Sequence, residues 1–289
     1  MSSRSCYLLA LLMLVTSPAW AEQTIEAQPV ASAPAIDGFG DDTAWASATP
    51  VITHDKVADI DLELRAVHTG NQIFIMVRYP DSDESRLHRS WRWDSEQERY
   101  ISAGDREDVL VLKWWLEGDS PTLSTSAGQP YRADIWYWKA CRTDPVGFAD
   151  DKIQILDSIS SARSQKITSP AGKTMYLTRR GDDGTSSYAT EIPGSFQGDK
   201  IPRFKISRPT GSRADIRARG RWADGWWVIE FARALDTGHD DDVVLRAGDR
   251  HFFGVSRYEI AASPADPRAE VPLFRSGDVG EPLYLTIVE

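Results

Sequence analysis

The sequence lacks several residues and motifs on which common classes of protein depend. Its 289 residues include only 2 Cys, which excludes a disulfide-rich scaffold, a cysteine zinc site and an iron–sulfur cluster. It contains no P-loop, no GxGxxG after a predicted strand, no GxSxG, no HExxH and no CxxCH. These absences remove the signatures of nucleotide-binding folds, α/β-hydrolases, zinc proteases and c-type cytochromes.

Basic charge is also scarce. There are 33 Lys+Arg against 43 Asp+Glu, which gives a formal net charge of −10. Because phosphate binding needs a basic face, we expect no nucleic-acid partner. No pair of carboxylates stands out as catalytic, and the Asp240–Asp242 run lacks the spaced ligands of a calcium loop. Nothing here indicates an enzyme that acts alone.

The chain has one marked apolar run, at residues 8–15, which follows Arg4 and precedes Ala19-Trp20-Ala21. This pattern predicts a secretory signal at residues 1–21 that is cleaved at the small-x-small site. The run is shorter than the roughly 20 residues that span a bilayer. We therefore expect residues 22–289 to form a single domain without a membrane span, in the periplasm or secreted.

The sequence after the predicted signal is typical of an all-β protein. Alternating apolar residues over 60–67 and 72–79 flank Gly70-Asn71, and residues 216–222 and 226–231 flank Asp224-Gly225. Both pairs predict hairpins. Further strands are predicted at 109–115, 135–139, 251–258 and 282–288. Many short strands separated by turn residues, without helical periodicity, predict an antiparallel β-sandwich.

The sequence also contains a long polar segment and two closely spaced pairs of tryptophans. Residues 157–212 are rich in Ser, Gly, Thr, Asp and Lys, which predicts an irregular insertion that lies over one end as an excursion or lid. The pairs Trp91/Trp93 and Trp136/Trp138 each place two rings on one face of a strand. These rings could fill the core, wall a ligand pocket or form a platform for sugar.

Four segments carry a resemblance to known families. Residues 36–45 (IDGFGDDTAW) are similar to the opening of family 9 carbohydrate-binding modules and DOMON-like domains. Residues 79–93, 134–151 (DIWYWKACRTDPVGFADD) and 220–238 resemble the ethylbenzene-dehydrogenase-type haem-binding domain, which is also described as cytochrome c-552/DMSO reductase-like. The resemblance extends over residues 34–288.

This resemblance implies a β-sandwich of the family 9 carbohydrate-module kind that binds haem b non-covalently in an apolar pocket. The implied role is electron transfer with a redox partner protein, such as a periplasmic oxidoreductase or a membrane cytochrome. In the family the iron is held by Met and Lys, and Met76 is the candidate methionine here. A thioether is a suitable soft axial ligand, although packing within an apolar strand also accounts for Met76.

The lysine ligand of the family lies near the C-terminus, but no Lys follows Lys205 in this sequence. Arg257 and Arg268 occupy that region and stay protonated, so neither replaces a neutral amine. His88 is the chemically easier ligand, because neutral imidazole binds iron readily. Lys139 could bind iron only if its pocket lowered its pKa. The alternatives are a solvated His88 and a Lys139 paired with Asp134 or another acid.

The cofactor-binding candidates are thus His88, Met76, Lys139, Trp91, Trp93, Trp136 and Trp138. The main alternative function is a carbohydrate-binding module of the family 9 kind, in which exposed Trp rings stack on sugar. A sandwich without a ligand, acting as a subunit or scaffold, also fits the fold, because function resides in the site and not in the fold.

Overall fold

The computed structural model describes residues 23–55, 59–119, 122–125, 128–169, 171–258, 281 and 283–289. The predicted signal at 1–21 and Arg268 lie outside these residues, as does the side chain of Arg257. Within the described ranges the chain is built of strands and three short 3-10 segments, η1 (Thr43–Ser47), η2 (Asp144–Val146) and η3 (Gly211–Ala214). No described helix is long and apolar enough to cross a membrane.

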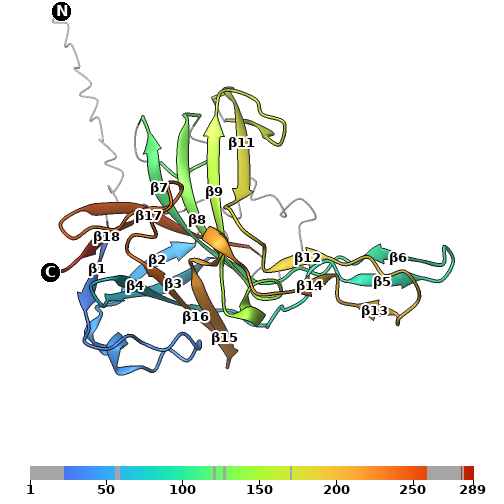
Figure 1. Ribbon diagram of the computed structural model, residues 1–289, viewed down its shortest axis with the longest axis horizontal. Coiled ribbons are helices and arrows are strands. Elements are labelled where there is room, and N and C mark those ends of the chain that lie inside the picture. Colours follow the sequence, from blue (N-terminus) through green and yellow to red (C-terminus); the bar gives the residue numbers. More distant parts are fainter. Residues whose placement is uncertain are drawn as a thin grey trace, which may run out of the picture.

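Thirteen of the described strands form one hydrogen-bonded sheet. Twelve follow the order β10-β11-β9-β8-β7-β17-β18-β1-β3-β4-β16-β15, and β2 pairs with β3 off this path. The path folds into two layers (Figure 1). The first layer contains β7 (Val109–Gly118), β8 (Tyr131–Lys139), β9 (Asp150–Asp157), β10 (Gln165–Thr168), β11 (Thr174–Gly181), β17 (Arg250–Tyr258) and β18 (Leu283–Ile287). The second contains β2 (Val51–Asp55), β3 (Ile60–His68), β4 (Gln72–Pro80), β15 (Arg217–Ala223) and β16 (Trp226–Ala234).

The predicted β-sandwich is confirmed, and so are both predicted hairpins. β3 pairs with β4, and β15 pairs with β16, each in antiparallel register. The exception to the antiparallel pattern is β1 (Gln23–Pro29), which runs parallel to β18 at its start and parallel to β3 at its end. β1 therefore joins the two layers along one side of the molecule.

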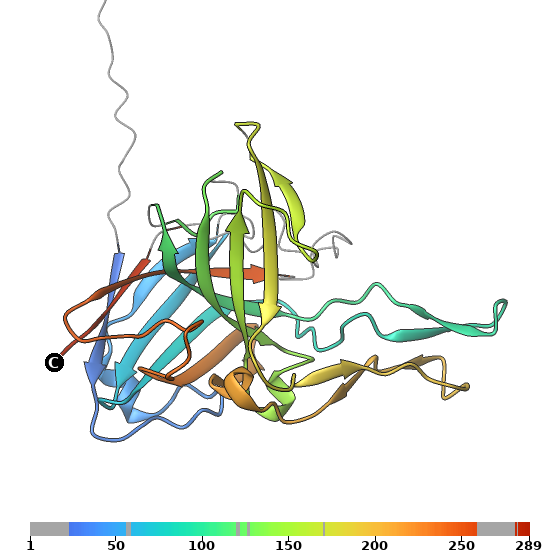
Figure 2. The ribbon, with the colours of Figure 1, turned by 45° about the horizontal axis from the view of Figure 1, so that its top comes forward.

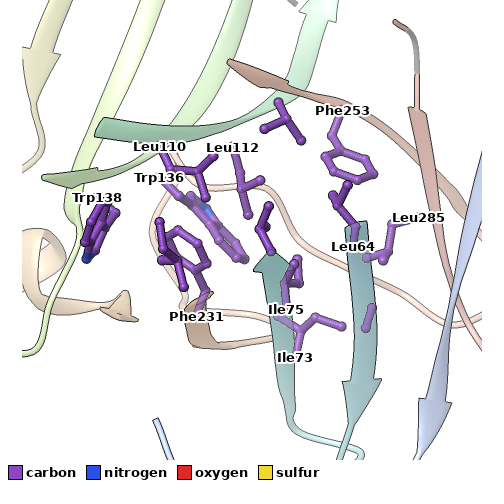
Figure 3. Packing of buried hydrophobic residues seen from close by; sticks show 14 of the residues in the cluster. Leu64, Ile73, Ile75, Leu110, Leu112, Trp136, Trp138, Phe231, Phe253 and Leu285 are labelled. Carbon is purple, nitrogen blue, oxygen red and sulfur yellow. The ribbon is translucent and has the colours of Figure 1, made fainter. Parts of the chain in front are cut away.

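The main core lies between the layers and is rich in aromatic rings (Figure 3). Trp136 and Leu112 reach into it from the first layer, and Ile75 and Phe231 reach into it from the second. The Trp114 ring stacks on Phe253 with a centroid distance of 4.5 Å. Burial of such large rings supplies the main favourable contribution to folding. A second apolar cluster occupies the opposite face of the first layer and includes Val111, Ile135 and Met175.

The glycine-rich segment before η1 is anchored by one buried carboxylate from the second layer. Glu230 accepts hydrogen bonds from the backbone N–H groups of Asp37, Gly38 and Gly40 at 2.9, 2.7 and 3.1 Å, and from the Trp45 indole at 3.0 Å. The opening motif and the β16 motif, which lie far apart in the sequence, thus form one structural unit.

A second pair of motifs meets at Asp144. Its carboxylate accepts hydrogen bonds from the Trp138 indole at 2.9 Å and from the backbone N–H of Gly220 at 2.6 Å. Gly220 lies directly under the Trp138 ring, because a Cβ at this position would lie 2.3 Å from that ring. Close approach of backbone to a large side chain is a typical reason for glycine inside a strand.

The 157–212 segment is more regular than the sequence indicates. β10 and β11 extend the first layer, and only the later part forms short ribbons: β12 (Tyr188–Thr190) pairs with β14 (Phe204–Ile206). β13 (Lys200–Ile201) joins β5 (Trp91–Asp94) and β6 (Arg99–Ser102) in a separate sheet. Figures 1 and 2 show this sheet as an arm that projects from one end of the sandwich. Local alternation does not reveal β10 and β11, because β10 has only 4 residues and β11 is rich in polar residues.

Candidate functional site

Two of the candidate residues, His88 and Lys139, lie in one polar cluster at the end of the sandwich from which the arm projects. Lys139 is the last residue of β8, and His88 belongs to the loop between β4 and β5. Tyr188 of β12 contacts Lys139, and Phe204 of β14 contacts His88. The rings of Tyr188 and Phe204 also contact each other, with a centroid distance of 5.5 Å. The β12–β14 ribbon therefore covers this cluster.

Lys139 is held in an ion pair. Its Nζ donates to Asp150 Oδ2 at 2.5 Å and to the Tyr188 hydroxyl at 2.9 Å. Burial lowers the pKa of Lys139 to about 8, although the Asp150 charge opposes this shift. Asp150 also pairs with Lys152 and Arg213. The alternative in which Lys139 pairs with an acid is therefore the one that the structure shows.

His88 is buried, and its Nδ1 lies 3.5 Å from Glu107 Oε1. Glu107 also accepts hydrogen bonds from the backbone N–H groups of Cys141 and Arg142 and pairs with the Arg142 side chain. The Arg142 guanidinium packs over the Phe204 ring at 5.4 Å. The solvated alternative for His88 is therefore wrong, because this side chain is enclosed by charged and aromatic neighbours.

The electrostatics of this cluster keep the imidazole neutral. Burial, followed by the positive charges of Arg142, Arg106, Arg89 and Lys139, lowers the pKa of His88 to about 2. The neutral form is the one that binds a metal ion. Burial, with the Glu107 charge, raises the pKa of the Cys141 thiol to about 11, so this thiol is not a nucleophile at neutral pH.

Met76 belongs to a different cluster. Successive residues of β4 face opposite sides of the sheet, so Ile75 and Val77 enter the main core while Met76 packs on the outer face with Phe74 and Trp45. The structure does not bring Met76 together with His88 or Lys139. For Met76, packing is the role that its contacts show.

The two Trp pairs have different surroundings. Trp136 and Trp138 are fully buried in the main core, where each contacts other aromatic rings. Trp91 and Trp93 lie on β5 in the arm, where both are partly exposed. The arm and the loop between β12 and β13 form an open hollow of about 240 Å³, lined by Trp91, Trp93, Glu98, Arg99, Tyr100, Ile192, Pro193, Gly194 and Ser195.

Several residues of the polar cluster escape prediction from the sequence. Arg142 and Asp150 lie within the 134–151 motif, so proximity to Lys139 in that motif is the signal that could have found them. Glu107, Tyr188 and Phe204 come from separate segments and carry no local signal. Their approach to His88 and Lys139 depends on how the loop, β7 and the β12–β14 ribbon pack.

The fold and this cluster define a β-sandwich protein with a buried polar site at one end and an aromatic arm beside it. The family model for ethylbenzene dehydrogenase matches residues 18–262. The chain belongs to this family. No curated protein matches the sequence.

Solved structures similar to this chain include family 9 carbohydrate-binding modules. The family 9 module from Caldicellulosiruptor kristjanssonii in complex with glucose is 10% identical, with 84% of this chain and 82% of that chain covered and a TM-score of 0.38. The same organism's family 9 module in complex with cellotriose is 10% identical, with 92% and 95% covered and a TM-score of 0.39. At this level of identity the likeness concerns the fold and not the ligand.

Proposed function

We propose that this chain is an exported electron-transfer protein that binds haem b non-covalently through His88 and exchanges electrons with a redox partner protein. The partner would be a periplasmic oxidoreductase or a membrane cytochrome, and the chain would act as a carrier or subunit and not as a catalyst by itself. The observation that carries the proposal is the buried, neutral imidazole of His88 in a member of the ethylbenzene dehydrogenase family.

The donor chemistry of the described residues fits haem at one axial position. His88 supplies a neutral imidazole, and Nε2 is the candidate ligand atom because Nδ1 faces Glu107. Arg142, Arg106 and Arg89 lie close enough to influence the charge of His88, and guanidinium groups suit the carboxylates of haem propionates. Lys139 forms an ion pair with Asp150, and Met76 packs in the cluster on the outer face of β4. Neither side chain would therefore supply the second axial ligand of the haem iron in this arrangement.

Bound haem would supply one-electron chemistry at the end of the sandwich. The protein's own contribution is to hold His88 in one orientation: Glu107 faces its Nδ1, as a carboxylate often orients a histidine that binds a metal. Arg142 in turn fixes Glu107. Phe204 and Tyr188 of the covering ribbon limit the access of water to this cluster.

Titration of purified protein with hemin, followed by absorption spectroscopy, tests the proposal. We expect a Soret band that shifts on binding and saturates at one equivalent, and His88→Ala should abolish the shift. His239→Ala is the matched control, because His239 is exposed and lies beside Asp215. Met76→Leu should leave the spectrum unchanged. A wild-type protein that shows no spectral shift would rule out haem binding.

The aromatic hollow on the arm favours carbohydrate binding as a second candidate function. Its Trp93 ring lies 5.0 Å from Tyr100 and 5.1 Å from Phe196, in edge arrangements. Partly exposed rings of this kind stack on sugar faces. Affinity electrophoresis in gels that contain soluble glucans would detect such binding, and Trp93→Ala should abolish it while Trp226→Ala should not. Unretarded wild-type protein would exclude glucan binding.

A further inference from the structure

A second group of charged residues is buried between the two layers and has no part in the proposed haem site. Asp134 of β8 and Asp151 of β9 are fully buried, and Asp242, from the loop after β16, is 5% exposed. One carboxylate oxygen from each lies within 4.8 Å of the others. Asp182, which follows β11, lies beside Asp151 and is also buried.

Strand register explains why these residues converge. Asp134 pairs with Ile153, and Asp151 pairs with Trp136, across the β8–β9 ladder. Paired residues share a face of the sheet, so both carboxylates enter the interior on the same side as Trp136. Asp182 comes next to the Gly181–Lys152 pair of β11 and β9, which brings it to the same point.

The negative charge of this group exceeds the positive charge that faces it. Arg233 of β16 is fully buried and contacts Asp134 at 2.6 Å and Asp242 at 3.7 Å. The ring of His239 lies 3.8 Å from Asp242, at the edge of the group. The Arg233 guanidinium thus interacts with three carboxyl groups, those of Asp134, Asp151 and Asp242, and burial of unpaired charge is costly.

Asp151 gives an independent indication that a ligand belongs here. It is fully buried, and no N–H or hydroxyl group donates to either of its carboxylate oxygens. The same holds for both oxygens of Asp182, whose hydrogen-bond partners are the carboxyl groups of Asp151 and Asp241, and for one oxygen each of Asp134 and Asp242. The other oxygens of Asp134 and Asp242 are well bonded, to the Trp136 indole and Thr237 among others. Asp134 and Asp242 are therefore anchored side chains, and each contributes an oxygen to the cluster that they form with Asp151.

We propose that Asp134, Asp151, Asp182 and Asp242 bind a divalent cation of the calcium class. Calcium takes about 6–8 oxygen ligands at roughly 2.3–2.6 Å, and the group offers six carboxylate oxygens to which no N–H or hydroxyl group donates. An all-carboxylate set suits calcium, whose coordination is flexible, better than magnesium, which needs near-ideal octahedral geometry and keeps several of its waters. The set contains no sulfur, which argues against a thiolate-bound metal.

The site joins both layers of the sandwich, so the ion would act as a structural clamp. Asp134 and Asp151 come from the first layer, and Asp242 follows β16 of the second. This inference stands independently of haem binding, because none of the four residues contacts His88 or Glu107 in the described interactions.

Thermal unfolding after removal of metal with EDTA tests the proposal, with CaCl2 or MgCl2 added back at constant ionic strength. We expect CaCl2 to raise the melting temperature more than MgCl2, since a ligand that binds only the folded state stabilises it. Asp151→Asn should bind calcium at least about tenfold more weakly, because it removes one ligand charge. Without calcium the same variant should be at least as stable as the wild type, because it relieves repulsion between carboxylates. Asp240→Asn is the matched control, because Asp240 is exposed in the same acidic run.

Terbium luminescence supplies a readout that does not depend on stability. Trp136 donates to Asp134 at 3.1 Å, so excitation of tryptophan should sensitise a terbium ion bound at the site, and added calcium should quench the signal by competition. The wild type and Asp240→Asn should show this emission, and Asp151→Asn should lose it. A melting temperature that is unchanged by calcium, or terbium emission that Asp151→Asn retains, would overturn the proposal.

Discussion

Glu230 offers the sharpest test of how the family motifs hold the fold together. In the substitution Glu230→Gln the side chain keeps its size but retains one oxygen acceptor in place of two. Each oxygen serves two donors: Oε2 accepts from Asp37 and Gly38, and Oε1 accepts from Gly40 and Trp45. Whichever oxygen becomes the amide nitrogen, two N–H donors then face another donor.

The structure also sets the size of the effect. One of the two lost hydrogen bonds is buried in either orientation, that of Gly38 or that of Trp45, and the other is partly buried. An unsatisfied buried donor costs about 1–3 kcal/mol, and hydrogen bonds to charged groups are at the strong end. We therefore expect Glu230→Gln to lower the free energy of unfolding by about 2–4 kcal/mol.

Urea denaturation followed by tryptophan fluorescence measures this loss, and limited proteolysis reports whether residues 35–48 loosen first. Glu63→Gln is the matched control on the same layer, because Glu63 forms a partly exposed pair with Arg65 at 2.8 Å. A pair of this kind contributes about 0–1 kcal/mol. If Glu230→Gln costs no more than Glu63→Gln, the anchoring role assigned to Glu230 is wrong.

Three further predictions concern packing and pH. Gly220→Ala should lower the free energy of unfolding by about 1–3 kcal/mol through overpacking, because its Cβ would lie 2.3 Å from the Trp138 ring; Gly104→Ala, which meets nothing within 4 Å, should have a much smaller effect on the melting temperature. Burial, aided by nearby carboxylates, raises the pKa of Asp108 from 3.8 to about 8. Between these two values the native state holds a proton that the unfolded state releases. The contribution of Asp108 to stability should therefore fall as the pH rises from about 4 to about 8. Asp108→Asn should remove this fall, and urea midpoints at the two ends of the window check it. The pH dependence from His88 has the opposite sign, because its pKa is lowered from 6.5 to about 2. Stability should therefore decrease as the pH falls below 6.5. Acid unfolding followed by circular dichroism checks this, and an unaltered midpoint in His88→Gln would contradict the role of His88 in it.

Much of the architecture follows from local pattern. The alternation over β3 and β4, and the Asp-Gly turn between β15 and β16, specify hairpins because period-two alternation buries one face of a strand. β10 and β11 were not predicted, because the pairing of β11 with β9 and of β10 with β11 stabilises them more than their own sequence does. The predicted signal at residues 1–21 stays a prediction.

In the candidate site, the sequence predicts which residue types are present but not how they are buried or paired. Trp91/Trp93 and Trp136/Trp138 share the same Trp-x-Trp spacing, but β8 faces a second layer while β5 lies in a three-stranded arm. The same pattern therefore yields buried rings in one place and partly exposed rings in the other. Likewise, residue type makes His88 an easier ligand than Lys139 but leaves both open. The structure shows the Lys139 ammonium paired with Asp150 and the His88 imidazole kept neutral by burial and by nearby positive charges.

The sequence by itself determined the all-β class, the hairpins, the acidic surface and the resemblance to a haem-binding family, because these depend on residue type and on spacing along one strand. Tertiary structure decided which face of β4 carries Met76, which aromatic pair is buried and which carboxylates meet. The physical reason is that charge and solvation act through space: Asp134, Asp151 and Asp242 come from three segments, and their oxygens lie within 4.8 Å of one another only after both layers have packed.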